Sequence, residues 1–384
     1  MFWSEKLIQI RQKPMYIGIN CLGRISLDTG GRTYLVNEIR NLARIDVQNK
    51  YYLFISAKKE DIFGTLPPNF HKIFLRFSGN SILRAVIEQL ILPFYISKLD
   101  IGIFYAPSNF DTVLSKSKSI VAIRSLLFYH FPYSIPLPQR IYRSIFVPLS
   151  VKRASKVVTV SKWMKKEICQ RYGIPLHKVE VIYHGVDASL FTMQRNMNLL
   201  KEYGVQKPYL LMVGVLWEYK NVDKVIEAFK ILKKKYKVKH RLVIVGRDYD
   251  GNRLEYEERA ERLGILNEII FTGPVSPHDL RYFYSAADVF VFPSKIESFG
   301  LPLLEAMACQ VPVVASNKAA IPEIVGDAGV VINPDDTATM ARAIYELINN
   351  SSLREDVVRR GKQRIKQFNW LKVAEKLHKA FSQL

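Results

Sequence analysis

Glu297 and Glu305 stand eight residues apart in the segment ESFGLPLLE, and both carboxylates could bind a ligand that carries hydroxyl groups. The residues between them predict a turn that opens a helix. Gly300 frees the backbone to turn sharply, and Pro302 suits the first helical turn, where its missing N–H is no loss. The pattern therefore predicts Glu297 just before the turn and Glu305 about one turn into the helix.

The start of such a helix is suited to anions, because its uncovered N–H groups lie at the positive end of the helix dipole. Two carboxylates beside a phosphate site suit a ligand with hydroxyls on both sides of a diphosphate, which is the shape of a nucleotide-sugar. Glutamates at this spacing also arise by chance. The context adds weight, because apolar runs over 289–292 and 311–315 flank the pair and predict one strand–turn–helix–strand unit.

The passage from 288 to 315 resembles the donor-site signature of family 4 glycosyltransferases, which have the GT-B fold. The resemblance implies an α/β protein with two doubly wound, Rossmann-like domains facing a cleft. It implies that Glu305 holds ribose hydroxyls, and that Glu297 holds sugar hydroxyls and orients the reacting carbon. The residues of the turn that would contact the donor are Phe299, Gly300 and Leu301.

A glycine pair marks the candidate ligand loop of the first domain. Asp28-Thr-Gly30-Gly31 follows the first apolar run and precedes a helical pattern. Paired glycines let a backbone approach a ligand, but any tight turn would use them too, and the segment is not the GxGxxG fingerprint. Because it matches the family's glycine loop, the resemblance implies that Gly30 and Gly31 contact the donor, with Arg32 near a phosphate.

Lys220 is the candidate cation of the second domain. It lies between an apolar run and a helical pattern, in the segment that begins at Gly214, so it is predicted at a strand-to-helix turn. A leaving nucleoside diphosphate needs cationic stabilisation as charge builds on it. The resemblance implies that Gly214 also lines the donor site. Relatives usually carry arginines where this chain has Val215 and Tyr219, and Lys220 could also be an ordinary surface lysine.

His184 and Arg124 are the candidate site residues of the first domain outside the glycine loop. The segment 183–187 resembles a family segment that lines the cleft, where His184 could bind a sugar or phosphate or merely cap a strand. Many relatives have a His-Asp pair near the reacting carbon where this chain has Arg124-Ser125. Arg124 is therefore expected to face the donor as a catalytic residue, and His130 is a site residue or a structural one.

Four further positions lie in passages that resemble the family. Ser294 could add a hydroxyl to the sugar pocket, and the backbone of Gly273-Pro-Val275 resembles the loop that holds the nucleobase. Glu323 is expected to support the fold rather than touch the ligand. Gln310 stands where relatives usually have glycine, which predicts only an altered turn.

Short apolar runs alternate with helical patterns, which predicts parallel sheets covered by helices. A polar stretch over 187–203 separates two sets of runs. We expect an N-terminal, acceptor-side domain over 1–187 and a nucleotide-sugar-binding domain over 188–366. The resemblance implies that the last helix, 367–384, returns to the first domain. The apolar segment 82–96 is too short to span a bilayer and predicts a helix packed in the first domain.

The chain of 384 residues has a net charge of +21, and the excess is uneven. Residues 1–187 hold 27 Lys+Arg against 12 Asp+Glu, net +15, while the remainder is net +6. A basic cluster runs from Arg140 to Arg171. An anionic membrane surface, a lipid-linked acceptor, a nucleic acid or simple solvation would each explain it. Sparse aromatics and the lack of a nucleic-acid motif favour the membrane surface or the lipid-linked acceptor, with no nucleic-acid partner.

Cysteine usage and the first residues bear on location and cofactors. The cysteines are three in number and widely spaced, so neither a disulfide framework nor a metal site is predicted. No His/Cys cluster points to a metal, and no cofactor is expected. The first residues lack the apolar core of a signal peptide. A cytoplasmic protein, peripheral on the inner face of the membrane, is expected.

The resemblance implies a retaining hexosyltransferase. It would move mannose or a glucose-type sugar from a GDP- or UDP-sugar to a hydroxyl of a glycan or polyprenyl-linked acceptor, in cell-surface polysaccharide synthesis. Same-face attack assisted by the departing phosphate needs no enzymatic nucleophile and no metal. A GT-B epimerase or phosphorylase would share the cleft, and an inactive scaffold would explain Arg124 in place of histidine, so both remain alternatives.

Overall fold

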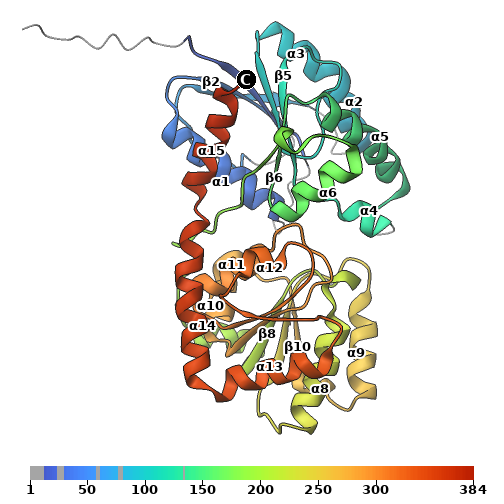
Figure 1. Cartoon of the computed structure of the whole chain (residues 1–384), viewed down its shortest axis with the longest axis vertical. Helices are drawn as coiled ribbons and strands as arrows, with labels where there is room; N and C mark the ends of the chain where they lie inside the picture. Colours follow the sequence, from blue (N-terminus) through green and yellow to red (C-terminus); the bar gives the residue numbers. More distant parts are fainter. Residues whose placement is uncertain (1–12, 24–29, 58–60, 77–80, 133–134) are drawn as a thin grey trace, which may run out of the picture.

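The computed structural model describes residues 13–23, 30–57, 61–76, 81–132 and 135–384. Two parallel sheets form the centres of two lobes, one above the other in Figure 1. The strand orders are β3-β2-β1-β4-β5-β6-β7 in the N-terminal lobe and β10-β9-β8-β11-β12-β13 in the C-terminal lobe. Each order reverses once, between β1 and β4 and between β8 and β11, which is the doubly wound arrangement. The predicted fold class is confirmed.

The elements of the N-terminal lobe are β1 (Tyr16–Cys21), α1 (Gly30–Ile45), β2 (Lys50–Ser56), β3 (Phe70–Leu75), α2 (Ser81–Val86), the π-helix η1 (Ile87–Ile91), α3 (Leu92–Lys98), β4 (Ile103–Ala106), β5 (Lys118–Ile123), α4 (Leu127–His130), α5 (Leu137–Arg153), β6 (Lys156–Thr159), α6 (Lys162–Tyr172) and β7 (Val179–Val181). Those of the C-terminal lobe are α7 (Met197–Glu202), β8 (Tyr209–Val213), α8 (Val222–Lys234), β9 (Arg241–Val245), α9 (Asn252–Arg262), β10 (Ile269–Gly273), α10 (Pro277–Ala286), β11 (Val289–Phe292), α11 (Leu301–Ala308), β12 (Val313–Ser316), α12 (Ile321–Val325), β13 (Val330–Ile332), α13 (Thr337–Asn349) and α14 (Ser351–Arg364). The last helix is α15 (Trp370–Ser382).

Alternation along the strands divides the core of the N-terminal lobe into two faces, because successive side chains of a strand point to opposite sides. Phe104 and Val121 pack in one cluster with residues of α3 and α5. Tyr105 and Ile120 pack in another with residues of α1 and α15. Helix α15 therefore covers the sheet face opposite to α5, and the two helices lie on opposite sides of the lobe in Figure 1.

The chain passes between the lobes twice, near Val186 and near Phe368, and the two segments lie side by side. The N–H of Val186 donates to the carbonyl of Phe368 at 3.1 Å, which links the two segments. A Cβ at Gly185 would lie 2.5 Å from the backbone nitrogen of Trp370, so only glycine fits there. This close approach sets Trp370 at the start of α15, whose apolar side then packs along α1.

The apolar segment 82–96 is helical but not a single α-helix. It divides into α2, the π-helix η1 and α3, with Pro93 in the first turn of α3. The polar side chains Glu88 and Gln89 point inward in η1 and are buried. They are satisfied there, since Asn20 Nδ2 donates to Glu88 Oε1 at 3.1 Å and Gln89 Nε2 donates to the carbonyl of Asp111 at 2.9 Å.

The loops at the carboxyl ends of the strands in the two lobes meet each other. Ser161 follows β6, and its Oγ donates to the carbonyl of Ser298, which follows β11, at 2.9 Å. The rings of Phe131, after α4, and Tyr219, after β8, have centroids 5.3 Å apart. Ligands of doubly wound sheets bind at this edge, so the lobes bring their two binding edges together.

Candidate active site

The C-terminal sheet places Lys220 and Glu297 at its switch point. Lys220 follows β8 and Glu297 follows β11, and these are the neighbouring strands between which the order of the sheet reverses. Lys220 Nζ lies 2.5 Å from Glu297 Oε1, and the two side chains are only 10% and 12% exposed. The sequence predicted separate roles for the two residues. The structure adds a direct, largely buried ion pair between them.

Local backbone geometry fixes Lys220. A single 3-10 turn covers Glu218–Lys220, and Asn221 takes a left-handed conformation with φ of 64° before α8 begins. The N–H of Lys295 donates to the carbonyl of Tyr219 at 2.8 Å, which ties this turn to the chain after β11. The Lys220 side chain then passes over Gly214, where a Cβ would lie 3.3 Å from its Cε.

Gly246 lies at the same edge of the sheet, and the sequence interpretation missed it. A Cβ at Gly246 would stand 1.8 Å from the carbonyl oxygen of Gly214, so the ends of β8 and β9 can approach only with glycine there. The N–H of Gly246 also donates to the carbonyl of Gly273 at 3.0 Å, which brings in the loop that leads to the half-buried Val275. Arg247 follows directly, as a second cation at this edge. The sequence feature that could have revealed Gly246 is its position, with Arg247, directly after the apolar run of β9.

Helix α11 begins where the sequence predicted. Gly300 is its N-cap with φ of 105°, a conformation that favours glycine, and Pro302 lies in the first turn. Leu301 is the first helical residue. Phe299 is buried before the turn, and its ring packs edge-on against that of His184 with centroids 5.0 Å apart. The turn therefore touches the N-terminal lobe.

Glu305 lies on α11 and is half-buried, and no Lys, Arg or His in the described ranges forms an ion pair with it. Tyr284 OH donates to Glu305 Oε2 at 2.9 Å. Burial raises the pKa of Glu305 from its ordinary 4.5 to about 7, although the hydrogen bond from Tyr284 opposes the shift. An ionised carboxylate can accept hydrogen bonds on both oxygens, so Oε1 has capacity for a ligand hydroxyl.

Among the buried polar atoms that have no hydrogen-bond partner within the described residues are His184 Nδ1 and Ser294 Oγ. Buried polar atoms are rarely left unsatisfied, so each is a place where a bound ligand or a water could contribute a partner. The His184 ring stacks on Tyr34 with centroids 5.5 Å apart. Burial, and next the charge of Arg124, hold the pKa of His184 well below its usual range, so the ring is neutral at pH 7.

The expectation that Arg124 faces the donor stays a prediction, and the structure shows that its side chain has partners within the N-terminal lobe. Its side chain is 8% exposed and lies within the N-terminal lobe, where Nη2 is 2.5 Å from Glu38 Oε1. Nη2 also donates to Tyr105 OH at 2.7 Å, and Nε donates to the carbonyl of Pro107 at 3.1 Å. The guanidinium stacks on the Tyr34 ring, 3.9 Å from its centroid. Arg124 thus contacts Tyr34, whose ring in turn stacks on that of His184.

The glycine loop is only partly described. Gly30 and Gly31 are the first residues of α1, which runs from the carboxyl edge of β1, while Asp28 and Thr29 lie outside the described residues. Arg32 follows in the first turn of α1 and is half-buried. The structure therefore gives the glycine pair a place at the switch point of the N-terminal sheet, between β1 and β4.

Glu323 connects the two lobes through hydrogen bonds to the N-terminal lobe. Its carboxylate accepts from the N–H groups of Lys162 and Trp163, at 2.7 and 3.1 Å, and so caps the start of α6 in the other lobe. Tyr183 OH donates to the same carboxylate at 2.8 Å. His130, by contrast, pairs with Glu167 at 2.6 Å within its own lobe. Both residues therefore have structural partners.

Within the described residues, no group of three or more His, Cys, Asp or Glu side chains is arranged to hold a metal ion. Asp248-Tyr-Asp250 is an Asp-x-Asp sequence that the sequence interpretation overlooked. The structure uses Asp248 as a cap, because its carboxylate accepts from the N–H groups of Gly251, Asn252 and Arg253 near the start of α9. No described helix is long and apolar enough to cross a membrane.

Solved structures place this architecture among GT-B glycosyltransferases. HepE from Anabaena, solved in complex with UDP-glucose, matches with a TM-score of 0.75 at 17% identity, over 96% of this chain and 100% of the other. At this identity the match shows the fold alone. Two family models cover most of the chain: "Glycosyltransferase Family 4" matches residues 29–190 and "Glycosyl transferases group 1" matches residues 200–364. The chain belongs to the family 4 glycosyltransferases.

Curated relatives share part of the chain. The O-antigen chain mannosyltransferase B of Escherichia coli is 29% identical over 70% of this chain and 69% of its own length. The O-antigen chain mannosyltransferase RfbU of Salmonella typhimurium is 30% identical over 56% of this chain and 58% of its own length. These matches therefore leave about a third or more of each relative's own length unmatched.

Proposed function

We propose that the chain transfers a hexosyl group, mannose or a glucose-type sugar, from a GDP- or UDP-sugar to a hydroxyl of a glycan or polyprenyl-linked acceptor. Two relatives are named as O-antigen chain mannosyltransferases, which supports mannose and a role in cell-surface polysaccharide synthesis. The UDP-glucose complex of a protein with the same fold supports a nucleotide-sugar donor. The proposed place of action is the cytoplasmic side of the membrane.

The observation that carries this proposal is the arrangement at the C-terminal switch point. A lysine and a carboxylate lie 2.5 Å apart beside the start of α11, and a second carboxylate, Glu305, lies farther along the same helix. The donor diphosphate would lie against the helix start and Lys220, with its sugar towards Glu297 and its ribose towards Glu305.

Each residue has a chemical role in this arrangement. Lys220 would stabilise the negative charge that builds on the departing diphosphate. Its ammonium has three N–H donors, so it can keep Glu297 in place with one and still bind phosphate oxygens with others. Glu297, oriented by that contact, would accept from sugar hydroxyls. The unpartnered Ser294 Oγ and His184 Nδ1 are further candidates for sugar or phosphate contacts.

The proposed chemistry retains the configuration of the sugar. The acceptor oxygen attacks the anomeric carbon on the face from which the diphosphate leaves. The bond from that carbon to the phosphate oxygen breaks, the bond to the acceptor oxygen forms, and the acceptor proton passes to the departing phosphate. Approach of the two lobes would exclude water from the reacting carbon and limit hydrolysis.

The test is a thermal-unfolding screen of the whole chain against GDP-mannose, UDP-glucose, GDP and UDP. A donor at 100 times its Kd stabilises the folded state by about 2.7 kcal/mol, so the true donor raises the Tm measurably. Glu305→Ala should abolish that shift, because the ribose loses its carboxylate. The control is Glu261→Ala, an exposed position on α9 that should keep the full shift. An undiminished shift in Glu305→Ala would remove Glu305 from the donor site.

A further inference from the structure

Helix α5 carries an unpartnered apolar stripe on its outer side. Leu137, Ile141, Ile145 and Leu149 follow one another at intervals of four residues, so they lie on one side of the helix over about 18 Å. Each of the four is between 47% and 56% exposed. The opposite side of the same helix is buried, with Val147 and Val151 in the core. The stripe is therefore not the buried side of an ordinary surface helix.

A second apolar stripe runs along the neighbouring helical segment. Leu83, Val86, Leu90 and Phe94 on α2, η1 and α3 are between 38% and 62% exposed. This segment packs beside α5, since Gln89 Nε2 donates to Tyr142 OH at 3.4 Å. The helices α2, α3 and α5 occupy the same side of the N-terminal lobe in Figure 1. We call these eight residues, with the basic residues of α5, the outer helical face.

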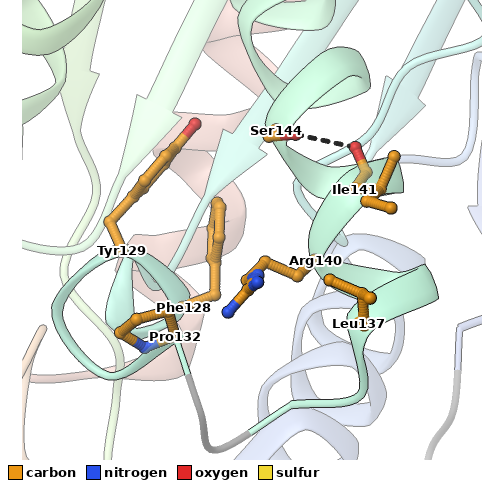
Figure 2. A pocket seen from close by; sticks show the side chains of 7 residues that line it. All are labelled: Phe128, Tyr129, Pro132, Leu137, Arg140, Ile141 and Ser144. Carbon is orange, nitrogen blue, oxygen red and sulfur yellow. Dashed lines mark hydrogen bonds between the residues drawn. The ribbon is translucent and has the colours of Figure 1, made fainter.

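A cavity deepens this face at the start of α5. It has a volume of about 310 Å³ and is lined by Phe128, Tyr129, Pro132, Leu137, Arg140, Ile141 and Ser144. Figure 2 shows Phe128 and Tyr129 on one side and Leu137 and Ile141 on the other, with Arg140 between them. Leu137 and Ile141 belong both to the stripe and to the cavity, so the two surfaces are continuous.

The charge around the stripe has one sign. Helix α5 itself carries four basic residues, Arg140, Arg143, Lys152 and Arg153, and no Asp or Glu. The nearby carboxylates are engaged: Asp111 pairs with Arg153, Glu88 lies 3.6 Å from Arg84, and Glu167 pairs with His130 and Arg171. Lys152, in the last turn of α5, is exposed and follows the stripe directly. Exposed apolar side chains therefore lie beside basic side chains on α5, which carries no acidic residue.

We propose that the outer helical face docks on a bilayer that contains anionic phospholipids, with its apolar side chains entering the acyl boundary and its basic side chains at the headgroups. Apolar burial and attraction to anionic headgroups act together in such binding. A second copy of the chain fits less well, because a two-fold contact would press the same positive surface against itself. The sequence pointed only to basic residues of the first domain, and the structure assigns the face and adds its apolar component.

The experiment measures partition of the whole chain onto vesicles of phosphatidylglycerol and phosphatidylcholine, and onto phosphatidylcholine alone. Ile145→Gln/Leu149→Gln should lower the partition coefficient on the anionic vesicles by roughly tenfold or more. The matched control is Leu254→Gln/Leu371→Gln, which changes exposed leucines on α9 and α15 and should leave binding unchanged. Unfolding curves establish that all variants fold.

The charge component is tested in parallel. Lys152→Glu should lower the partition coefficient on the anionic vesicles by roughly tenfold. The change removes the favourable contribution of one basic residue to the binding free energy and adds a repelled negative charge. Lys376→Glu, an exposed position on α15 across the sheet, should have a much smaller effect. Because vesicle binding needs no sugar donor, this test can fail or succeed independently of the transfer activity.

Three outcomes would overturn the proposal. The wild-type chain could fail to bind anionic vesicles. It could also bind neutral vesicles equally well, with the same partition coefficient for Lys152→Glu as for the wild type. Alternatively, Ile145→Gln/Leu149→Gln could convert a dimer to a monomer without affecting vesicle binding. That last result would make the outer helical face a contact between two copies of the chain.

Discussion

Each lobe holds a cation and a carboxylate at 2.5 Å near the carboxyl edge of its sheet: Arg124 with Glu38 in the N-terminal lobe and Lys220 with Glu297 in the C-terminal lobe. The two pairs are alike in distance and both are largely buried, although the Glu297 side chain is 12% exposed and that of Glu38 only 3%. They differ in what surrounds the cation. The difference separates a pair that holds a lobe together from a pair that is available to a ligand.

Arg124 has several partners within its own lobe. Its guanidinium has a carboxylate, a hydroxyl, a backbone carbonyl and an aromatic ring around it, all from the same lobe. Burial opposes the charge, but Glu38 and the neighbouring hydroxyls raise the pKa of Arg124 above its ordinary value. Lys220 donates to Glu297 and otherwise lies 5.3 Å from the ring centroids of Tyr219 and Phe292. Aromatic rings are weak hydrogen-bond acceptors, so the ammonium group of Lys220 keeps N–H donors for a ligand.

The largest expected effect is on stability, from breaking the pair of Arg124 and Glu38. Arg124→Ala leaves Glu38 buried without its cation, and removal of one partner of a buried pair destabilises by about 3–5 kcal/mol. Urea unfolding of the whole chain, read for the N-terminal lobe by its tryptophan and tyrosine signals, should show this loss. Arg124→Lys should recover only part of it, because a lysine cannot reproduce the forked donors.

The double variant Arg124→Met/Glu38→Leu is the control for this prediction. Replacing both members of a buried pair by apolar residues of similar size is often neutral or stabilising, so most of the loss should disappear. If Arg124→Ala unfolds like the wild type but abolishes turnover of the donor, Arg124 is a catalytic residue, and the contrast between the two pairs is wrong.

The second prediction concerns activity at the other pair. Lys220→Met should lower kcat for release of nucleoside diphosphate by about 10²- to 10³-fold, which is the usual effect of removing one group that stabilises transition-state charge. Stability should fall much less than in Arg124→Ala, because Glu297 retains some exposure. The substrate for the assay is whichever nucleotide-sugar shifts the Tm of the wild-type chain.

Two companion variants sharpen this result. Lys234→Met, exposed at the far end of α8, should leave kcat unchanged. Lys220→Met/Glu297→Gln removes the unpaired carboxylate and should recover stability while activity stays low. A single Lys220→Met variant with normal turnover would show that the lysine merely neutralises Glu297.

The sequence predicted the parts of the fold that depend on local patterns. The buried central strand β11 is a continuous apolar run, and its predicted bounds, 289–292, are those observed. Strand β3, FHKIFL, was missed because it lies at the sheet edge, where polar side chains interrupt the apolar ones. The start of α11 was predictable because glycine and proline have strong local preferences.

Contacts between distant residues were not predictable from one sequence. The pairing of Arg124 with Glu38, 86 residues away, depends on how α1 packs against β5, which no local pattern reveals. The cap that Glu323 provides for α6 depends on how the two lobes face each other. Gly246 could have been found, since a glycine directly after a buried strand often marks a close backbone approach.

The smallest predicted effect extends the comparison to the carboxylate of Glu305, which forms no ion pair with the part of the chain that the structure describes. The pKa of Glu305 in the folded chain is about 7, above its ordinary 4.5, so the folded state binds this proton more tightly than the unfolded state does. The resulting stability is fully present below pH 4.5 and is lost as the pH rises through 7. In Glu305→Gln this loss should be absent, because the amide does not titrate and can still accept from Tyr284.

The free energy of unfolding of Glu305→Gln, relative to the wild type, should therefore rise between pH 5 and pH 8 by about 1–3 kcal/mol. The gain should accompany weaker donor binding, because a neutral amide is a poorer acceptor for ribose hydroxyls than a carboxylate. Urea unfolding at the two pH values measures the first effect and the thermal screen the second. Equal pH dependence in variant and wild type would mean that Glu305 is already ionised and solvated. Its burial would then say nothing about a ligand.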